Sequence, residues 1–418
     1  MHPLYELGIR SYHLAIRLAR LWSPKARLWV SGRKGWHAKL KAALPEGAPR
    51  VWFHCASLGE FEQGRPLIEA YKRQDPQVHV VLTFYSPSGY EVRKNYAGAD
   101  TILYLPPDGA SNARTFLDLL QPQAAFFVKY EFWYHYLWQL QQRSVPTFLV
   151  SGIFRPSQPF FKPLMGRWMR KMLAGFAWMF VQDEASLELL KTFELNNASV
   201  AGDTRFDRVY EIVRAAKRIP EVEAFKGGSL MLVAGSTWPR DEDLLAPLLL
   251  DERLPLKAVI APHEIGEGHL QLLAQRFGAQ AVFLSKARAE DVQAARVLIV
   301  DSIGLLSSIY QYGELAYVGG GFGAGIHNVP EAAAWGIPVV FGPNHKKFRE
   351  AVELMQQGGA VGISSAEEGR EVLRKFLTDT DARSAAGRIA GQYVENAVGA
   401  TERILSMVRA LNSPTASS

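Results

Sequence analysis

Short apolar runs recur along most of the chain, and stretches with the polar and apolar spacing of helices separate them. In the first half, the runs lie at residues 51–55, 78–84, 101–105, 124–128 and 147–150. In the second half, they lie at residues 230–234, 259–261, 282–284, 296–301, 315–318 and 337–341. Buried strands that alternate with helices are typical of a parallel sheet. The pattern therefore predicts doubly wound α/β domains.

One break in this alternation divides the chain. Residues 200–207 read VAGDTRFD, and the polar helical stretch 214–225 follows before the alternation restarts at Leu230. A chain of 418 residues is long enough for two domains with complete cores. We expect a helical N-terminal segment, two domains, and a C-terminal helix that packs back on the first domain. The expected boundaries are 1–50, 51–207, 208–381 and 382–418.

The most distinctive stretch spans residues 316–350, AYVGGGFGAGIHNVPEAAAWGIPVVFGPNHKKFRE. A buried strand ends there in a glycine-rich turn that contains Gly320 and Gly321, and we expect a helix over residues 332–335. A strand, a glycine turn and a helix form an arrangement in which backbone N–H groups approach a phosphate. Glycine turns also serve packing alone, so the cluster by itself is weak evidence.

The residues after this turn strengthen the case for a nucleotide site. Pro330 suits the first turn of a helix, where a missing N–H costs little. Glu331 can accept two hydrogen bonds, as a ribose diol would offer. Together with Asn328, these residues follow the carboxyl end of a strand, where doubly wound sheets bind their ligands.

The net charge of +6 is unevenly distributed. Residues 1–50 hold ten Lys and Arg against two Asp and Glu and carry +8, whereas the rest of the chain holds 37 basic and 39 acidic residues and carries −2. We therefore expect a local anionic surface as partner, and no nucleic acid. The single cysteine, Cys55, excludes an intramolecular disulfide and fits a reducing compartment.

Residues 4–22, LYELGIRSYHLAIRLARLW, have the pattern of an amphipathic helix. The polar residues recur at spacings of three and four and would form one narrow stripe: Glu6, Arg10, His13, Arg17 and Arg20. Such a helix suits a membrane interface, where arginine side chains reach anionic head groups. A full span is disfavoured, because each arginine near the bilayer centre costs at least about 2.5 kcal/mol. The alternative is a helix that packs on its own domain.

Two carboxylates follow strands of the first domain. Glu60 lies on the loop after the run 51–55, and Glu131 follows the run 124–128. Loops at the carboxyl ends of parallel strands form the binding crevice, and a carboxylate there can act as a general base. From the residues alone, a helix N-terminal cap is the better interpretation of Glu60. The aromatic residues around Glu131 suit either a core or a sugar-facing wall.

Further candidate residues are basic. Residues 154–175 place Arg155 and Lys162 among aromatic and aliphatic side chains, which suits either an acceptor with phosphates and acyl chains or a solvated helix face. His263 directly follows a strand and Pro262, where a phosphate contact is the favoured interpretation.

The sequence predicts no required metal. The acidic run 241–243 matches a metal-binding Asp-x-Asp, but three acidic residues that open a helix are more often partners of its dipole. No zinc-ligand spacing occurs. The chain also lacks Gly-x-x-x-x-Gly-Lys-Ser/Thr, which disfavours a P-loop nucleotidase.

Taken together, these features resemble the 3-deoxy-D-manno-octulosonic acid (Kdo) transferase family, the inner-core glycosyltransferases of lipopolysaccharide. The resemblance runs nearly end to end and rests on the N-terminal helix and on residues 32–34, 57–60, 131–133, 202–207, 235–237, 262–263 and 319–343. It implies a GT-B-like α/β fold, in which two Rossmann-like doubly wound domains face a cleft, with an N-terminal amphipathic membrane-associated helix. It also implies a place at the cytoplasmic face of the cell inner membrane of a Gram-negative bacterium, peripheral or N-terminally anchored.

The resemblance further implies an inverting transfer of Kdo from CMP-Kdo to the lipid A precursor lipid IVA, without a metal or other cofactor. Glu60 would be the general base, which reverses the preference for a cap. The acceptor and substrate residues would be Ser57, Gly59, Glu131, Arg155 and Lys162. The CMP contacts would be Pro262, His263, Gly313, Glu314, Leu315, Gly320, Gly321, Asn328, Val329, Pro330 and Glu331. Some family members carry Pro-Arg where this chain has Pro262-His263, and a neutral histidine neutralises phosphate less well.

Two other classes of function stay open. One is another membrane-associated GT-B glycosyltransferase that uses a UDP- or GDP-sugar. The other is a nucleotide-sugar sensor that has kept the fold without activity. The chain retains both Glu60 and the glycine turn, which argues against a lost activity.

Overall fold

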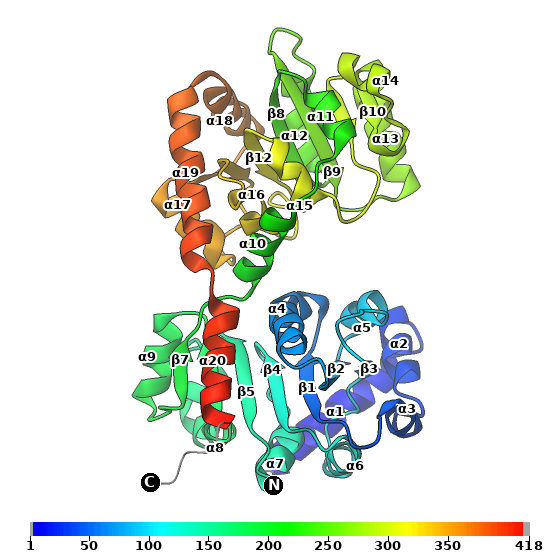
Figure 1. Cartoon of the computed structure of the whole chain (residues 1–418), viewed down its shortest axis with the longest axis vertical. Coiled ribbons are helices and arrows are strands. Elements are labelled where there is room, and N and C mark those ends of the chain that lie inside the picture. Colours follow the sequence, from blue (N-terminus) through cyan, green and yellow to red (C-terminus); the bar gives the residue numbers. More distant parts are fainter. Residues whose placement is uncertain (1–2, 413–418) are drawn as a thin grey trace. The chain divides into compact units, whose positions relative to one another are not determined.

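The apolar runs of the sequence form the strands of two parallel sheets, one in each of two units (Figure 1). The computed structural model describes residues 3–412, without the side chains of residues 164–165, 289–291 and 412. The first unit extends to Asp207 and resumes at Gly399, and the second unit covers residues 208–398.

The first unit has, within the described residues, a seven-stranded sheet in the order β3-β2-β1-β4-β5-β6-β7. Its strands are β1 (Arg50–Cys55), β2 (His79–Phe84), β3 (Thr101–Tyr104), β4 (Ala124–Val128), β5 (Thr147–Gly152), β6 (Trp178–Val181) and β7 (Ala198–Val200). Its helices are α1 (Pro3–Ala19), α2 (Pro24–Gly32), α3 (Trp36–Ala43), α4 (Leu58–Gln74), α5 (Pro87–Arg93), α6 (Ala110–Leu120), α7 (Tyr134–Gln142), η1 (Pro159–Phe161), α8 (Pro163–Ala174), α9 (Glu184–Thr192) and α20 (Ala400–Asn412). Helix α10 (Arg205–Ala215) begins in this unit and continues into the second.

Helices cover both faces of the first sheet, as the βαβ connection requires. On one face, α3, α6, α7 and α8 bury side chains such as Phe116 and Tyr136 against Trp52 of β1. On the other face, α4 and α20 bury Leu67 and Ile404 against the sheet. Every strand of this sheet is parallel to its neighbours, so all the loops that follow strands lie at one edge.

The second unit repeats the design with the strand order β10-β11-β9-β8-β12-β13-β14, all parallel. The strands are β8 (Leu230–Thr237), β9 (Leu256–Pro262), β10 (Ala281–Phe283), β11 (Val297–Ile299), β12 (Leu315–Val318), β13 (Val339–Phe341) and β14 (Ala360–Gly362). The helices are α11 (Pro220–Lys226), α12 (Pro239–Leu249), α13 (Glu267–Phe277), η2 (Gly278–Gln280), η3 (Leu284–Lys286), α14 (Ala289–Ala294), α15 (Leu306–Ile309), η4 (Tyr310–Tyr312), α16 (Val329–Ala333), α17 (Arg349–Gln357), α18 (Ala366–Thr378) and α19 (Thr380–Ala397).

Each sheet has a point at which the strand order reverses. In the first unit this point lies between β1 and β4, and in the second it lies between β8 and β12. The loops after two such strands diverge to opposite faces and leave a crevice at the carboxyl edge. The topology therefore directs attention to the residues that follow these four strands.

The predicted α/β class with two parallel sheets is confirmed. The structure adds the short strands β6, β7 and β14, which the apolar pattern did not show because runs of three or four residues carry little periodicity. The helix expected over residues 214–225 is two helices, α10 and α11, because Pro220 begins a new one.

The C-terminal region differs from the single helix expected over residues 382–411. Helix α19 ends at Ala397 in the second unit, and α20 begins at Ala400 in the first. Between them, Gly399 has a φ of +100°, a conformation that ends a helix. The Asp207 carboxylate accepts hydrogen bonds from the backbone N–H of Gly399 (2.5 Å) and Thr401 (2.6 Å). It thus ties together the two places where the chain changes unit; residues 413–418 of the expected segment lie outside the described residues.

The sequence suggested that the polar residues of helix α1 form one outward stripe. The structure turns some of them toward the first unit instead. Glu6 Oε1 lies 2.7 Å from His135 Nε2, and His13 is buried, so both face the first unit. Four leucines of α1 are exposed instead on the opposite side: Leu4, Leu7, Leu14 and Leu18. The helix therefore packs on its own unit through partly polar contacts and presents an apolar face to the outside. Within residues 3–412, no helix has both the length and the apolar character needed to cross a bilayer.

Arg33, just after α2, is buried in a cage of carbonyl groups and aromatic rings. Its guanidinium donates hydrogen bonds to the carbonyl oxygens of Leu105 (2.7 Å), Trp29 (2.9 Å) and Tyr85 (2.7 Å). It lies 3.9 Å from the centre of the Trp29 ring. Arginine spreads its donors over three nitrogens, so it can reach three separate carbonyls at once. Lysine carries its three donors on a single nitrogen and cannot span these carbonyls. Arg33 therefore fixes the N-terminal helices to the loops after β2 and β3.

We expect Arg33→Lys to destabilise the first unit by about 2–4 kcal/mol, because at least one buried carbonyl loses its partner and the ring contacts are lost. Urea denaturation followed by tryptophan fluorescence would measure this loss, since Trp29 reports on the cage. Lys34→Ala, at an exposed neighbouring position, should change the stability by less than about 0.5 kcal/mol. Equal denaturation midpoints for Arg33→Lys and the wild type would contradict the structural role.

Candidate active site

The first element of the candidate site is the turn between β1 and α4. Ser57 is the N-cap of α4, and Glu60 occupies the third position of the helix. One carboxylate oxygen of Glu60 accepts hydrogen bonds from the backbone N–H (3.0 Å) and the hydroxyl (3.3 Å) of Ser57. This is the capping interaction that the residues alone suggested. Gly59 is exposed with open space around its Cα, so the approach to Glu60 is not blocked there.

The environment of Glu60 favours a protonated carboxyl group more than water does. Burial raises the pKa of Glu60 to about 7, and the charge of Glu131 adds to this shift. The amides of Ser57 and Ala56 and the ammonium group of Lys129 act in the opposite direction. A carboxyl group with a pKa near neutrality can both accept and release a proton, as a general base must.

Glu131, on the loop after β4, is held by a buried network. Its Oε2 accepts a hydrogen bond from Trp133 Nε1 (2.6 Å) and lies 3.0 Å from His54 Nε2. His54 belongs to β1, and its Nδ1 lies 2.8 Å from the hydroxyl oxygen of Thr83 on β2. Trp52 Nε1 donates to that same hydroxyl oxygen (2.8 Å). The network therefore links three neighbouring strands at the carboxyl edge of the first sheet.

The Thr83 hydroxyl connects Trp52 to His54 in this network. Trp52 Nε1 donates to the hydroxyl oxygen, which lies 2.8 Å from His54 Nδ1, and His54 Nε2 lies 3.0 Å from the Glu131 carboxylate. These contacts fix the position of Glu131, whose charge is one cause of the raised pKa of Glu60.

Lys129 adds a positive charge to the same loop. It follows β4 with a φ of +68°, a conformation that residues other than glycine rarely adopt. Its backbone N–H donates to the carbonyl oxygen of Val150 (2.8 Å), which helps to hold the turn in place. Its charge favours the ionised form of Glu60. Sequence patterns gave no sign of this residue, because a lysine after a strand resembles any surface lysine.

Arg155 and Lys162 are the two basic residues predicted to bind the acceptor, and their described contacts involve different parts of the first unit. Burial raises the pKa of Tyr130, and the charge of Arg155 opposes that shift, so Arg155 lies near the loop after β4. Lys162 is exposed at the N-terminus of α8. Among the hydrogen bonds and ion pairs of residues 3–412, none joins Lys162 to the loops that carry Glu60 and Glu131.

In the second unit, the glycine turn follows β12 closely packed against the neighbouring loops. Gly320 has a φ of +90°, and a Cβ added at Gly321 would lie 2.5 Å from the backbone nitrogen of Gly342. No other residue type fits these positions without a shift of backbone. The helix that follows, α16, begins at Val329 and has five residues, rather than covering residues 332–335 as expected. Within the turn, the N–H groups of Gly319, Gly323 and Gly325 donate to backbone carbonyl oxygens and so hold its shape.

A buried carboxylate fixes this turn. Asp241 Oδ2 accepts hydrogen bonds from the backbone N–H of Gly320 (2.9 Å) and of Trp238 (2.9 Å). Its Oδ1 accepts from the Tyr317 hydroxyl (2.7 Å). Asp241 therefore joins the start of α12 to the glycine turn across the point where the strand order reverses. The sequence analysis interpreted this acidic run as partners of the helix dipole. Asp241 indeed lies in the first turn of α12, where it caps the helix, and it also contacts the glycine turn.

Three aromatic rings stack beside the glycine turn. The His263 ring stacks on Trp238 (4.9 Å between ring centres) and on His327 (4.1 Å), and Trp238 Nε1 donates a hydrogen bond to His327 Nε2 (3.3 Å). The three residues follow β8, β9 and β12, so they converge from three strand ends. Burial, with a smaller contribution from the charge of His263, lowers the pKa of His327 to about 4. His327 is thus uncharged at neutral pH in the empty site, and a bound anion would reverse the shift.

Asn328 and Glu331 lie next to each other at the start of α16. Asn328 Nδ2 donates to Glu331 Oε1 (2.6 Å), and the Ser307 hydroxyl donates to Glu331 Oε2 (2.6 Å). Asn328 Oδ1 is buried and accepts no hydrogen bond from the described residues. The two donors hold the Glu331 carboxylate at the start of α16. The site therefore offers a polar ligand both an unused acceptor and a carboxylate.

Val329 and Pro330 are buried, so their side chains belong to the core rather than to a ligand surface. Pro262 is likewise buried as the last residue of β9 and serves to place His263. These three predicted CMP contacts lie at the carboxyl edge of the second sheet, and their contact with CMP stays a prediction.

Gly313, Glu314 and Leu315 are a correction to the prediction. Glu314 accepts from the backbone N–H of Met231 (2.8 Å) and forms an ion pair with Lys226 (2.5 Å), and Leu315 is fully buried. They lie at the amino ends of β8 and β12, whereas the glycine turn follows the carboxyl end of β12. The four residues of β12 separate the two ends by about 13 Å. The family resemblance suggested this assignment, whereas the position of these residues directly before the run 315–318 already indicates the amino edge.

No metal site emerges from the described side chains, among which no three His, Cys, Asp or Glu residues converge. The expected independence from metal stays a prediction.

The chain is similar to known proteins in sequence and in fold. Residues 30–208 match the family described as 3-deoxy-D-manno-octulosonic-acid transferase (kdotransferase). The chain is 27% identical to the 3-deoxy-D-manno-octulosonic acid transferase of Aquifex aeolicus, over 77% of this chain and 83% of the relative. It is 26% identical to the Bordetella pertussis enzyme of the same name, over 96% of this chain and 98% of the relative. The Haemophilus influenzae counterpart is 21% identical over 94% of each.

The solved structures that resemble the chain share its fold. A UDP-N-acetylglucosamine 2-epimerase has a TM-score of 0.59 at 14% identity and covers 87% of this chain and 96% of its own. The Neisseria meningitidis UDP-GlcNAc 2-epimerase bound to UDP-GlcNAc has a TM-score of 0.59 at 14% identity, with 86% and 99% covered. At this identity the likeness supports a GT-B-like fold and nothing finer.

We expect Glu60→Gln to stabilise the protein at alkaline pH. The pKa of Glu60 is raised from 4.5 to about 7, so the folded state holds a proton that the unfolded chain releases, and stability is lost as the pH rises through this window. Glutamine keeps the capping acceptor without a charge to desolvate. Above pH 7 the free energy of unfolding should therefore rise by about 1–3 kcal/mol, and the gain should shrink toward pH 4.5.

Urea denaturation at pH 5 and pH 8 would measure this difference. Glu62→Gln, on the same helix, removes a carboxylate that is paired with Arg93 (2.8 Å) and should show no such gain at pH 8. A Glu60→Gln variant that is less stable than the wild type at pH 8 would show that the desolvation cost has been misjudged.

Proposed function

We propose that this chain, a member of the Kdo transferase family, transfers Kdo from CMP-Kdo to the lipid A precursor lipid IVA, with Glu60 as the general base. The observation that carries this proposal is a carboxyl group with a raised pKa at the carboxyl edge of the first sheet, fixed by a helix cap and adjacent to a second, network-held carboxylate. Glycosyl transfer to a hydroxyl needs such a base.

In this mechanism, Glu60 accepts the proton of a lipid A hydroxyl as the hydroxyl oxygen attacks the anomeric carbon of Kdo. The C–O bond to the phosphate of CMP breaks on the opposite face, so the configuration inverts. No general acid is required, because CMP leaves as a weakly basic phosphate. Burial and the charge of Glu131 raise the pKa of Glu60 to near neutrality, and the charge of Lys129 limits that shift.

The second unit supplies the donor site in this proposal. The stacked pair His263 and His327, beside the glycine turn, receives the phosphate. Asn328 and Glu331 receive the ribose and base edges through the unused acceptor of Asn328 and the carboxylate of Glu331. Charge that grows on the leaving phosphate is stabilised where these donors already point. No metal ion is required for any of these contacts.

The proposed location is the cytoplasmic face of the inner membrane, where α1 lies on the bilayer surface. Four exposed leucines on one side of α1 support this, since an apolar helix face turned away from the core suits a membrane interface. Arg10 and Arg17 are exposed on the same helix and would reach anionic head groups.

We expect Glu60→Gln to reduce Kdo transfer at least about 100-fold while leaving the affinity for CMP nearly unchanged. Mass spectrometry of lipid IVA incubated with CMP-Kdo measures the transfer, and calorimetry measures CMP binding. For the wild type, kcat/KM should rise with pH through about 7 and then level off, because the base must be ionised.

Glu62→Gln serves as the matched control and should retain the pH profile. A parallel loss of CMP affinity in Glu60→Gln would make Glu60 a binding residue instead. If wild-type protein that binds CMP adds no Kdo, competition with UDP and GDP would test the alternative, a glycosyltransferase for another nucleotide sugar.

We expect CMP binding to raise the pKa of His327 from about 4 toward the ordinary 6.5, because the phosphate favours the charged imidazolium. Proton NMR of the histidine rings across a pH titration, assigned with His327→Gln, measures this shift. Cytidine, which lacks the phosphate, should leave the value unchanged. A His327 pKa that stays near 4 in saturating CMP would mean that the phosphate binds elsewhere.

A further inference from the structure

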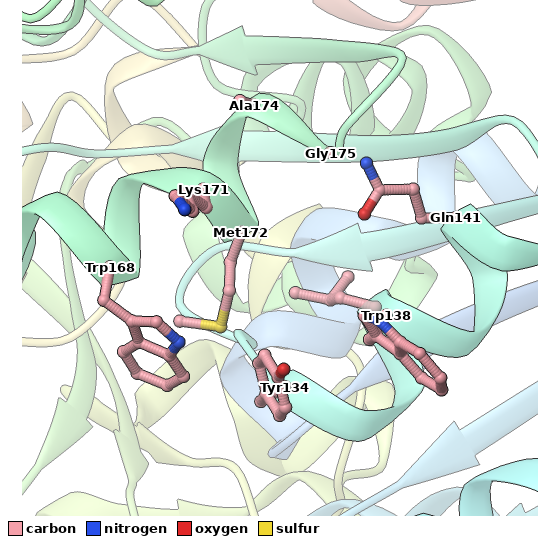
Figure 2. Close-up of a pocket in the computed structure, with 9 residues that line it drawn as sticks. Tyr134, Trp138, Gln141, Trp168, Lys171, Met172, Ala174 and Gly175 are labelled. Atoms are coloured by element: carbon pink, nitrogen blue, oxygen red, sulfur yellow. The ribbon is translucent and has the colours of Figure 1, made fainter. Parts of the chain in front are cut away.

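A cavity of about 400 Å³ opens on the first unit between α7 and α8, away from the residues assigned to the reaction. Figure 2 shows the side chains that face it, with Trp168 and Lys171 from α8 on one side and Trp138 from α7 on the other. The volume lies in the range of small-molecule sites. Nothing in the proposed transfer of Kdo uses this cavity.

The interior of the cavity is apolar and its rim is amphipathic. Leu137 and Met172 are buried and form the floor, whereas Trp138 is 42% exposed at the edge. Lys171 is exposed at the rim, and Gln141 is the other polar side chain there. The amide of Gln141 and the ammonium group of Lys171 are exposed at the rim, whereas the buried lining residues Leu137 and Met172 are apolar, which suits a hydrocarbon chain better than a nucleotide or a sugar.

Two residues of the cavity wall support α1. Tyr5 of α1 packs on Tyr134 (5.4 Å between ring centres) and on Trp168 (5.7 Å), and both of those residues line the cavity. Leu4 and Leu7 of the same helix are 60% and 67% exposed. The inner face of α1 therefore rests on the wall of the cavity, while its leucines face outward.

The charge on this side of the unit complements an anionic lipid. Helix α8 carries Arg167, Arg170 and Lys171 and no Asp or Glu. Arg167 and Lys171 are exposed one turn apart, so they lie on one face of the helix near the cavity rim. Lysine and arginine close to a bilayer are attracted to its anionic head groups, and interfacial tryptophan is typical of the same depth.

We propose that this cavity binds one acyl chain of an anionic phospholipid from the membrane leaflet, with the phosphate of the head group held by Lys171 and Arg167. The inference rests on the membrane association included in the proposed function, and it adds a specific lipid site to a general surface contact. The tether would hold the first unit at a fixed depth and orientation on the bilayer.

The test uses vesicles of phosphatidylglycerol whose acyl chains carry bromine, which quenches tryptophan at short range. The full chain has ten tryptophans, so the difference between the wild type and Trp138→Phe isolates the contribution of the cavity. Phenylalanine keeps the apolar wall, so binding should persist while part of the quenching is lost. If the two proteins are quenched to the same extent on binding, no acyl chain enters the cavity and the proposal is overturned.

A second variant tests the head-group contact. Lys171→Glu should weaken binding to phosphatidylglycerol vesicles by about fivefold or more, because a basic residue near an anionic surface contributes about 1 kcal/mol. Leu272→Ala, which shortens an exposed apolar side chain of α13, is the matched control and should bind as the wild type does. Equal affinity of Lys171→Glu and the wild type would remove the anionic head group from the proposal.

These readouts separate the lipid site from the proposed reaction. Vesicle binding and quenching require no turnover, so they can succeed in a protein that transfers no Kdo. Transfer to detergent-dispersed lipid IVA by Trp138→Phe and Lys171→Glu should equal that of the wild type. If brominated lipid IVA quenches Trp138 and brominated phosphatidylglycerol does not, the cavity is a subsite for the acceptor and the phospholipid proposal is wrong.

Discussion

The uniform direction of the strands is the constraint on which the rest of the structure depends. Because both sheets are wholly parallel, every loop that follows a strand lies at one edge, and the reversal of strand order opens a crevice there. Glu60 and Glu131 follow β1 and β4, on either side of the reversal in the first sheet. Trp238 and the glycine turn follow β8 and β12, on either side of the reversal in the second. Residues far apart in the sequence meet because the topology leaves them no other edge.

At Glu60 the same few contacts serve folding and chemistry. The amide of Ser57 holds the carboxylate as a cap and stabilises its charge, while burial and the charge of Glu131 disfavour that charge. The opposing effects leave the pKa near neutrality. The position of Glu131 depends in turn on Trp133, whose ring stacks on Tyr85 (4.4 Å), and the carbonyl of Tyr85 accepts from Arg33. A structural arginine near the N-terminus thus supports the electrostatics of the site.

The sequence predicted the strands, the glycine turn and the carboxylate after β1, because apolar runs, glycines and strand ends are local signals. It did not predict the role of His54, since a histidine inside the apolar run 51–55 has no feature that separates it from a core residue. The resemblance places Glu314 among the CMP contacts, although Glu314 directly precedes the run 315–318 and therefore lies at the amino end of that strand. Only the folded chain shows that Lys129 and His327 face the two carboxyl edges.

Helix α1 is the clearest case in which tertiary contacts, rather than the pattern of polar and apolar residues, determine which face of a helix is exposed. A helix normally turns its leucines toward the core, yet here Tyr5 donates to Asp108 (2.5 Å) and Glu6 contacts His135, so polar contacts fix the inner face. Four leucines of α1 then remain outside, and each apolar side chain taken from water is worth about 1.5–3 kcal/mol. In water this arrangement leaves that stabilisation unused. In the proposed association with a bilayer surface it would become binding energy, and the polar inner contacts would hold the first unit to the helix that lies on the membrane.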